Sequence, residues 1–305
     1  MAAVWLIAGS TASGKSALAL DLARREGGEI VNADSMQVYR DLQVLTARPT
    51  AEDEASVPHH LYGVADGAEA WSVGRWLRAA QAVLDEIAAR GRPAIVVGGT
   101  GLYLRALTHG LAETPAVPDE VRARMAIRME LKGEGFFRTM LASVDPEAEA
   151  RIAPGDRQRL IRAAAVFQAS GRPLSTWRAD THPVLSPGAW RGLVIELPRD
   201  ELYARIEARV DFMLAQGAVS EVETLLARDL ARDLPIMKAL GVRELGTFVR
   251  QEASSAQAAA ALKQQTRRFA KRQGTWFRNQ APDLPRIMSR EEVGPTGMTT
   301  VNQTA

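Results

Sequence analysis

The sequence contains no cysteine, which excludes disulfide bonds, thiolate catalysis and cysteine-ligated zinc sites. No apolar stretch approaches the roughly 20 residues that cross a bilayer. The apolar run at residues 2–8 has no basic leader and continues directly into a glycine loop, so we expect a buried strand there and not a signal peptide. Together these absences predict a cytoplasmic protein in a reducing compartment, without membrane contact.

Lysine is also scarce, since only five of the 38 basic residues are lysines. The formal net charge is only +2, so charge alone gives no argument for nucleic-acid binding. Arginine suits phosphate binding and base stacking better than lysine does, but the codon bias of a GC-rich genome explains the arginine excess equally well. The contents of 46% hydrophobic and 24% charged residues are ordinary for a globular protein, and 305 residues suffice for one large domain or two smaller ones.

Short apolar runs alternate with helical patterns in the first part of the chain. This alternation predicts βαβ units and a parallel sheet, that is, an α/β fold of the P-loop type flanked by helices. We expect strands at residues 4–8, 29–32 and 93–97, and helices at 16–25 and 73–90.

The middle of the chain has a different pattern. Residues 116–185 are rich in Arg and Ala and almost free of strand patterns, which predicts an inserted all-helical domain. Residues 191–198 return to a strand pattern that we expect to rejoin the sheet, and residues 199–278 are mostly helical. The predicted domains are a core of residues 1–115 and 186–285, the insertion 116–185, and a polar tail 286–305 that we expect to be disordered.

Residues 9–16 (GSTASGKS) match the P-loop pattern Gly-x4-Gly-Lys-Ser, with a predicted strand before and a predicted helix after. Glycines let several amide N–H groups point at one anion, and the helix adds its positive N-terminal end. Lys15 supplies a mobile charge and Ser16 a hydroxyl group for Mg²⁺. The motif predicts a phosphate site with Mg²⁺ as cofactor, made by Gly9, Ser10, Thr11, Ala12, Ser13, Gly14, Lys15 and Ser16. It leaves open whether the phosphate is transferred, as in kinases, or departs as diphosphate.

Two further polar residues follow predicted strands, where ligands bind in parallel sheets. Asp34 can accept a proton or bind a metal there, but it can equally cap a helix. Thr100 lies in a glycine-rich turn, where its hydroxyl either faces the same crevice or caps the next helix. His59 and His60 have no further metal-like cluster beside them, and we interpret them as structural.

Residues 263–278 carry six positive charges and no acid, interleaved with aromatic residues. On a helix Phe269 and Trp276 share one face, and the basic residues surround it. Such a helix can follow a phosphate backbone, or it can be a solvated helix packed by its aromatic residues. The charge imbalance favours nucleic acid.

Five segments, in the same order along the chain, resemble the bacterial tRNA dimethylallyltransferase family. The resemblance implies transfer of a dimethylallyl group from dimethylallyl diphosphate to the exocyclic amine of adenosine 37, in the anticodon loop of tRNA, with release of diphosphate. It also implies a monomer with a P-loop core and an inserted tRNA-binding domain. The segments are GSTASGKS at residues 9–16, DSMQVYR at 34–40, TARPT at 46–50, VGGTGLYL at 97–104 and TRRFAKRQ at 266–273.

The same resemblance assigns roles to individual residues. Asp34 accepts the proton of the adenine amine, Thr100 positions the reacting centre, and Lys15 and Arg205 hold the diphosphate. The target base must leave its stack to reach such a site. The residues that the resemblance assigns to tRNA are Asp34, Ser35, Met36, Gln37, Thr100, Arg122, Gln158, Arg159, Leu160, Ile161, Arg162, Arg268 and Arg272.

The sequence departs from the family pattern at Ser10, where a proline is common, and at Leu45, where a glycine is frequent, and neither change removes a chemical group. Three alternatives remain open at this point. A P-loop kinase of small molecules explains residues 9–16 but not the basic helix. A non-catalytic RNA-binding module leaves the intact Lys15 and Ser16 without a role. Prenylation of free adenine nucleotides gives no role to the basic helix or the insertion.

Overall fold

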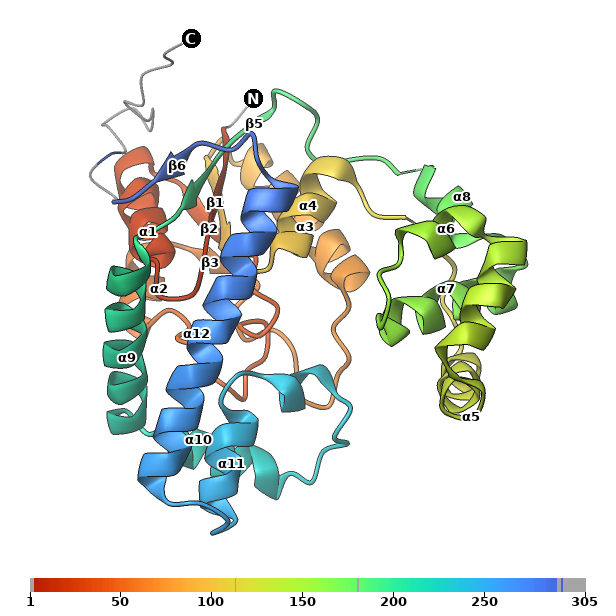
Figure 1. Cartoon of the computed structure of the whole chain (residues 1–305). Coiled ribbons are helices and arrows are strands. Elements are labelled where there is room, and N and C mark those ends of the chain that lie inside the picture. Colours follow the sequence, from red (N-terminus) through yellow and green to blue (C-terminus); the bar gives the residue numbers. More distant parts are fainter. Residues whose placement is uncertain (1–2, 113, 180, 290–291, 293–305) are drawn as a thin grey trace. The chain divides into compact units, whose positions relative to one another are not determined.

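The computed structural model describes residues 3–112, 114–179, 181–289 and 292. Its internal contacts divide the chain into two units. The first comprises Met1–Thr108 with Leu185–Ala305, and the second comprises His109–Val184. The first unit has the α/β architecture that the sequence predicts (Figure 1).

The first unit is built on a six-stranded sheet with the strand order β3-β2-β4-β1-β5-β6, and all of its strand pairs are parallel. The two central strands are apolar and almost wholly buried, as expected where helices cover both faces of a parallel sheet. The strands are β1 Val4–Gly9, β2 Glu29–Asn32, β3 His59–His60, β4 Ala94–Gly98, β5 Trp190–Ile195 and β6 Arg286–Ile287.

Helices pack on this sheet and beside it. Leu18 and Leu22 of α1 are buried against Ile7, Ile95 and Ile195 of three adjacent strands. The helices of this unit are α1 Lys15–Glu26, α2 Ala51–Ser56, α3 Val73–Ala89, α4 Gly101–His109, α9 Arg199–Ala215, α10 Ala218–Ala227, the 3₁₀ helix η1 Pro235–Lys238, α11 Val242–Val249 and α12 Ser255–Gln280.

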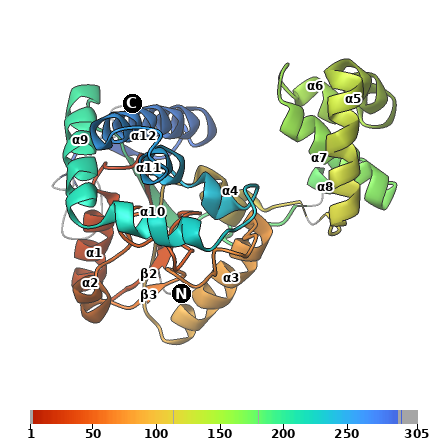
Figure 2. The same cartoon turned by 90° about the horizontal axis from the view of Figure 1, so that it is seen from below.

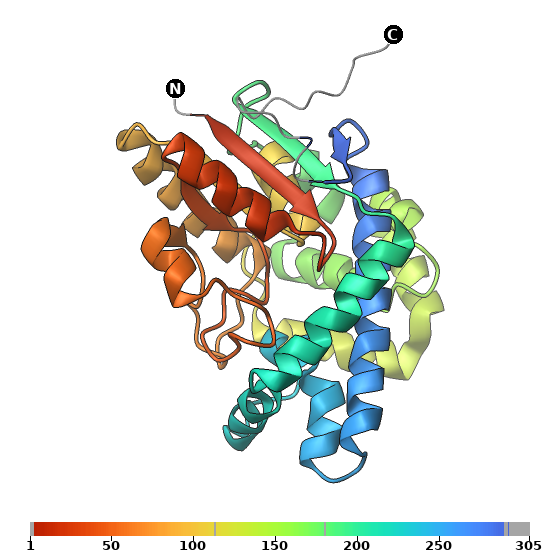
Figure 3. The same cartoon turned by 90° about the vertical axis from the view of Figure 1, so that its left-hand side faces the viewer.

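Two of these helices, α9 and α12, lie side by side next to the sheet (Figures 1 and 3). Ion pairs join them, from Lys263 to Asp211 at 2.7 Å and from Arg267 to Glu207 at 2.9 Å. Part of the positive charge of residues 263–278, the basic segment of α12, is therefore neutralised by α9.

Over its described residues, the second unit consists of four helices, which lie together in Figure 2. They are α5 Asp119–Val144, α6 Pro146–Arg151, α7 Arg157–Ser170 and α8 Leu174–Ala179. α5 is kinked at Gly133, whose φ of 73° is not helical. The core of this unit includes Met129, Phe137, Leu141 and Leu160, all fully buried.

The predicted tail requires a correction at its start. Residues 286–287 form β6, which pairs Val194 with Arg286 and Ile195 with Ile287. Ile287 is fully buried against the sheet core, which explains why the chain stays ordered there. A strand of two residues has no periodicity that a sequence can display. Residues 290–291 and 293–305 of the predicted tail lie outside the described residues.

The parallel strands bring four loops to one edge of the sheet, because the chain leaves every strand at its carboxyl end. β1 leads into the P-loop, β2 into the Asp34 segment and β4 into the Thr100 turn. β5 leads into α9, which carries Arg205. The topology alone thus gathers the P-loop, Asp34, Thr100 and Arg205 at one edge of the sheet.

The amino end of β2, away from the Asp34 segment, carries a buried carboxylate. Glu29 is 2% exposed and accepts hydrogen bonds from Arg90 at 2.8 and 3.0 Å, while its second oxygen also lies 2.7 Å from Nε2 of His60. These bonds, above all those from Arg90, hold the pKa of the Glu29 carboxyl below its usual value. His60 therefore has a structural partner.

We expect Glu29→Gln to lower the free energy of unfolding by about 2 kcal/mol near neutral pH, because bonds to a charged acceptor become bonds to a neutral amide. Since the folded-state pKa of Glu29 is depressed, its contribution is present above the unfolded-state pKa and is lost as the pH falls through the folded-state pKa. The difference between the two proteins should therefore shrink at acid pH. Urea unfolding of both proteins across this range measures it, and a difference that stays constant into acid would contradict the assignment.

Candidate active site

The backbone of the P-loop is tightly curled. Ala12 and Gly14 have φ values of 64° and 92°. A Cβ at Gly9 would lie 3.0 Å from the carbonyl oxygen of Ile195, so glycine suits this close approach. Lys15 donates a hydrogen bond from Nζ to the Ser10 carbonyl at 3.2 Å. Because the amides of the first turn of α1 have no acceptors within the helix, the loop forms a cradle for an anion.

Gln273 of α12 fastens this loop to its neighbour. Its Oε1 accepts a hydrogen bond from the Thr11 amide, and its Nε2 donates one to the Gly99 carbonyl, both at 2.9 Å. The Ser10 hydroxyl donates to the carbonyl of Ala270 at 3.1 Å. One amide and one hydroxyl of the predicted phosphate set are therefore engaged by α12, and the anion cradle depends on the remaining groups.

Lys15, Asp34 and Arg209 are all half-buried, and their charges act on one another. Burial lowers the pKa of Lys15 to about 8, while the Asp34 carboxylate raises it and Arg209 lowers it further. Burial also lowers the pKa of Arg209, against the effect of the same carboxylate. The predicted meeting of Asp34 with the P-loop lysine is thus present in the structure, together with a second cation.

Arg205 and Arg209 lie one turn apart on α9, on the same side of that helix. A Cβ at Gly14 would be 3.4 Å from Nη1 of Arg205, which places this predicted residue beside the P-loop. Arg205 also pairs with Glu201 at 2.7 Å. Arg209 was not among the predicted site residues, although its spacing of four residues from Arg205 was a usable signal.

Hydrogen bonds from the backbone amides that follow Asp34 link the Asp34 segment to Thr100. The Met36 amide donates to Oδ1 of Asp34 at 2.9 Å, and the Ser35 amide donates to the Thr100 hydroxyl at 3.0 Å. A turn and no helix follows Asp34, so the helix-cap alternative is wrong for this residue. A Cβ at Gly98 would overlap the carbonyl of Ala33, and this glycine is what lets the two loops touch.

Two tyrosines that were not among the predicted site residues lie near Asp34. Burial raises the pKa of Tyr62, and the Asp34 carboxylate adds to the effect. Burial likewise raises the pKa of Tyr103, with smaller effects from Tyr39 and Asp34. The ring of Tyr103 is stacked on Trp76 with centroids 4.2 Å apart. Two neutral phenols therefore lie within electrostatic range of the carboxylate.

The loop after Asp34 is held by its own side chains. Gln37 donates from Nε2 to the carbonyls of Thr46 and Ala47, both at 2.9 Å, so the amide group predicted to contact tRNA is bound within the loop. Arg209 donates to the same Thr46 carbonyl at 3.4 Å. The carboxylate of Glu221 on α10 accepts from three successive amides, at 2.6, 2.7 and 2.9 Å, those of Gln43, Val44 and Leu45.

The predicted tRNA residues of the second unit fall into two groups. Gln158, Arg159 and Arg162 are exposed near the start of α7. Partial burial of the guanidinium lowers the pKa of Arg162, and the charge of nearby Arg122 lowers it further. Leu160 is fully buried in the core of that unit, so its selection as an RNA contact is corrected, because its side chain offers no surface. Ile161 packs partly against the same core.

The basic segment of α12 also divides in two. Lys263, Arg267 and Arg278 pair with acids, the last with Glu196 at 3.0 Å. Three further cations, which include the predicted Arg268 and Arg272, are exposed and have no acidic partner among the described residues: Arg268, Lys271 and Arg272. The helix thus contacts the P-loop with one side and keeps its unpaired charge on another.

Within the described ranges, no group of three or more His, Cys, Asp and Glu residues is arranged to hold a metal ion. The ring of His59 is bonded to the Val57 carbonyl at 2.7 Å. In the same part of the chain, every helix is too short or too polar to span a membrane.

Family models match the chain over most of its length. The IPP transferase model matches residues 37–280 and the isopentenyl transferase model matches residues 2–62. The chain belongs to the IPP transferase family. Relatives named tRNA dimethylallyltransferase include one from a Caulobacter species, 58% identical over 96% of this chain and 94% of the relative, and one from Phenylobacterium zucineum, 56% identical over 95% and 94%.

Solved structures share this IPP transferase fold. The tRNA isopentenylpyrophosphate transferase from Bacillus halodurans is 34% identical, with a TM-score of 0.66 over 94% of this chain and 90% of that one. A eukaryotic dimethylallyltransferase acting on tRNA is 25% identical, with a TM-score of 0.79 over 94% and 74%. The predicted family and fold class are confirmed.

The lowered pKa of Lys15 predicts a pH dependence of diphosphate binding. Because its pKa is about 8, Lys15 is mostly charged near neutrality and loses its charge as the pH rises through that value. We therefore expect the affinity of the free protein for dimethylallyl diphosphate, measured by calorimetry, to fall above about pH 8. Lys15→Arg should flatten this decline, since arginine keeps its charge. An identical alkaline decline in that variant would exclude Lys15 as its cause.

Proposed function

We propose that this chain transfers a dimethylallyl group from dimethylallyl diphosphate to the exocyclic amine of an adenosine in tRNA and releases diphosphate. The observation that carries the proposal is the position of the Asp34 carboxylate, whose charge acts on the half-buried P-loop Lys15. A proton acceptor and an anion cradle in one crevice suit a reaction that needs both at once. The family and the names of the relatives support the same activity.

The chemistry assigns one task to each side of the crevice. The adenosine nitrogen attacks the terminal allylic carbon, and the bond from that carbon to the diphosphate oxygen breaks with its electron pair on the oxygen. Lys15, Arg205 and the amides of the P-loop stabilise the charge that develops on the diphosphate. Asp34 accepts the proton from the amine. Thr100, bonded to the Asp34 loop, keeps the carboxylate in position.

A magnesium ion would be held at the P-loop mainly by the diphosphate of the substrate. Mg²⁺ usually takes one or two protein ligands and completes its shell with phosphate oxygens and water. Ser16 is exposed in the first turn of α1, and its hydroxyl makes no hydrogen bond to another described residue. We propose that Ser16 and the diphosphate hold the ion, which supplies further positive charge to the leaving group.

The substrate RNA extends these assignments to the second unit. We propose adenosine 37 of the anticodon loop as the acceptor, which must be flipped out of its stack to enter the crevice. Gln158, Arg159, Arg162 and Arg122 of the second unit, with Arg268 and Arg272 of α12, supply the polar and positive surface for the RNA. We further propose that the chain acts as a monomer in the cytoplasm.

The alternative of a small-molecule kinase is not favoured, because relatives 50–58% identical are named for dimethylallyl transfer to tRNA. The decisive assay offers both donors. With labelled dimethylallyl diphosphate and tRNA we expect labelled tRNA and one diphosphate per transfer. With labelled ATP we expect neither hydrolysis nor phosphate transfer. Transfer of label from ATP, with no labelled tRNA in the first arm, would overturn the proposal.

Asp34→Asn tests the proton acceptor within this mechanism. The amide retains the size of the carboxylate but accepts a proton poorly, so we expect turnover to fall by about 10²-fold or more. Binding of tRNA should stay within about tenfold of the wild type, since the loop geometry is preserved. Single-turnover kinetics and filter binding give the two values. Unchanged turnover would remove Asp34 from the mechanism.

A further inference from the structure

A carboxylate of α10 holds the loop at residues 42–48, which contains neither helix nor strand. Oε1 of Glu221 accepts from the amides of Gln43 and Val44 at 2.6 and 2.7 Å, and Oε2 accepts from that of Leu45 at 2.9 Å. Successive amides that converge on one anion form a nest, and bonds to a charged acceptor are stronger than bonds to a neutral one. These three amides have no other acceptor among the described residues, so Glu221 fixes the path of the 42–48 loop.

α10 itself is held in the fold by contacts other than those of Glu221, which lies in the first turn of this helix. At the far end of α10, Arg228 pairs with Asp66 at 2.7 Å and also with Asp41. Three apolar side chains of the helix are buried: Ala218, Val222 and Leu225. Replacement of Glu221 leaves all of these contacts in place, so its three bonds serve the 42–48 loop.

The 42–48 loop in turn holds the side chain of Gln37. The residue after the three bonded amides is Thr46, whose carbonyl accepts from Nε2 of Gln37 at 2.9 Å. The carbonyl of Ala47 accepts the second bond from the same nitrogen, also at 2.9 Å. Both N–H groups of the Gln37 amide are therefore used inside the protein, and rotation of this amide by 180° would place its oxygen against two carbonyl oxygens.

The other end of this amide is Oε1, which accepts no hydrogen bond from the described residues. Gln37 is half-buried and follows Asp34 by three residues. An oxygen held in this way offers an acceptor, and only an acceptor, to an N–H group of a base.

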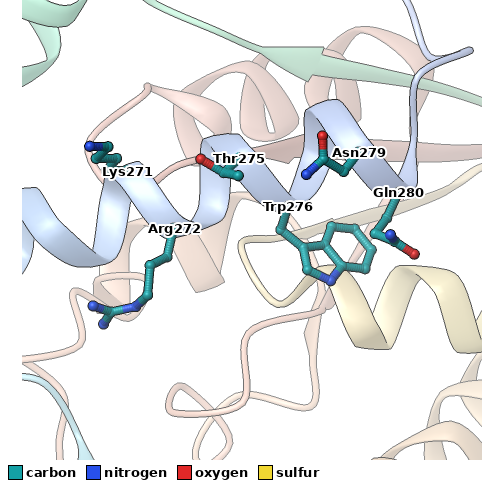
Figure 4. Close-up of a pocket in the computed structure, with 6 residues that line it drawn as sticks. All are labelled: Lys271, Arg272, Thr275, Trp276, Asn279 and Gln280. Atoms are coloured by element: carbon teal, nitrogen blue, oxygen red, sulfur yellow. The ribbon is translucent and has the colours of Figure 1, made fainter. Parts of the chain in front are cut away.

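The exposed cations of α12 offer a different kind of contact. Lys271 and Arg272 extend from that helix without an acidic partner among the described residues (Figure 4). Contacts of such groups with phosphate position a nucleic acid, whereas contacts with base edges specify its sequence. Contact with a base edge needs a group of fixed orientation, and the 42–48 loop gives Gln37 that orientation.

We propose that Glu221 is a positioning residue for the transfer reaction. By fixing the 42–48 loop, it keeps in place the two carbonyls that hold the Gln37 amide, so that the amide oxygen faces the RNA and accepts from an N–H group of a base. The inference rests on the proposed function, because it requires RNA at the Asp34 segment. It adds to that function a residue that touches no substrate and acts through Gln37.

Glu221→Gln tests this series of contacts. The amide keeps the size of the carboxylate but has one acceptor oxygen, and its NH₂ group faces backbone N–H groups. We expect the KM for a tRNA stem-loop to rise about tenfold, the scale of one lost hydrogen bond. The kcat should stay within about threefold. The affinity for dimethylallyl diphosphate should change as little, since the bond from Arg209 to the Thr46 carbonyl is long, at 3.4 Å.

Steady-state kinetics and calorimetry measure these values, and urea unfolding is measured beside them. A role of Glu221 confined to stability would lower the unfolding midpoint and leave the KM for RNA unchanged. That outcome would overturn the proposal.

The matched control is Glu223→Gln, the same change at an exposed residue of the same helix. Because Glu223 makes no bond to the 42–48 loop, the KM for RNA should stay at the wild-type value. A rise in KM equal to that of Glu221→Gln would show that the lost charge on α10 is the cause, and would refute the assignment to the loop.

A double-mutant cycle with Gln37→Ala tests whether Glu221 acts through Gln37. Gln37→Ala alone should raise the KM for RNA about tenfold. Addition of Glu221→Gln should then raise it by no more than about twofold, because the group that Glu221 positions is already absent. Multiplication of the two single effects would contradict the proposed route.

Hydrogen exchange on the wild type covers the case in which Glu221→Gln does not fold. The amides of Gln43, Val44 and Leu45 should exchange slowly, although they lie outside helices and strands. Exchange as fast as that of a solvated loop would overturn the proposal. Failure of the wild type to prenylate any tRNA would instead refute the proposed function, whereas prenylation with an unchanged KM in Glu221→Gln would refute only the role of Glu221.

Discussion

One buried glutamine, which accepts one hydrogen bond and donates another, holds the two halves of the active site together. β1 and β4 fix where the P-loop and the Thr100 turn begin, but a strand does not fix the tip of the loop that follows it. Gln273 does so by accepting from Thr11 and donating to Gly99. Because a buried amide is costly unless both of its ends are bonded, α12 can pack here only when both loops are in place. A helix remote in sequence is thereby a structural part of the P-loop site.

The positive charge of the first unit is distributed between two environments. Lys15 and Arg209 are half-buried, where the reduced dielectric strengthens their attraction for a compact anion but disfavours their own charge, as their lowered pKa values indicate. Arg268, Lys271 and Arg272 are exposed, where each contact is weaker and is screened by salt. Lys263 and Arg267 belong to neither group, because Asp211 and Glu207 of α9 neutralise their charges. The division matches a small diphosphate inside and an extended RNA backbone outside.

Local pattern predicted what depends on local physics. The strands, the P-loop and the position of Asp34 followed from hydrophobic runs, glycine spacing and the rule that ligands bind at the carboxyl ends of parallel strands. Gln273 and Tyr62 could not be selected, because their roles exist only after distant segments pack together. Arg209 could have been found from its spacing to Arg205. The prediction for Leu160 came from the resemblance of the whole segment 158–162 and was wrong, because Leu160 lies on the buried side of α7.

The direction of the chemistry follows from where the carboxylate lies. A P-loop stabilises negative charge on phosphate oxygens, which serves phosphoryl transfer and departure of diphosphate equally well. The Asp34 carboxylate accepts a hydrogen bond from the Met36 amide, the Thr100 hydroxyl accepts one from the adjacent Ser35 amide, and the charge of Asp34 acts on Lys15. A proton acceptor at that place serves a nucleophile that loses a proton as the anion leaves. The glycine at position 98, which lets the two loops touch, is therefore as much a condition of the reaction as the charged groups.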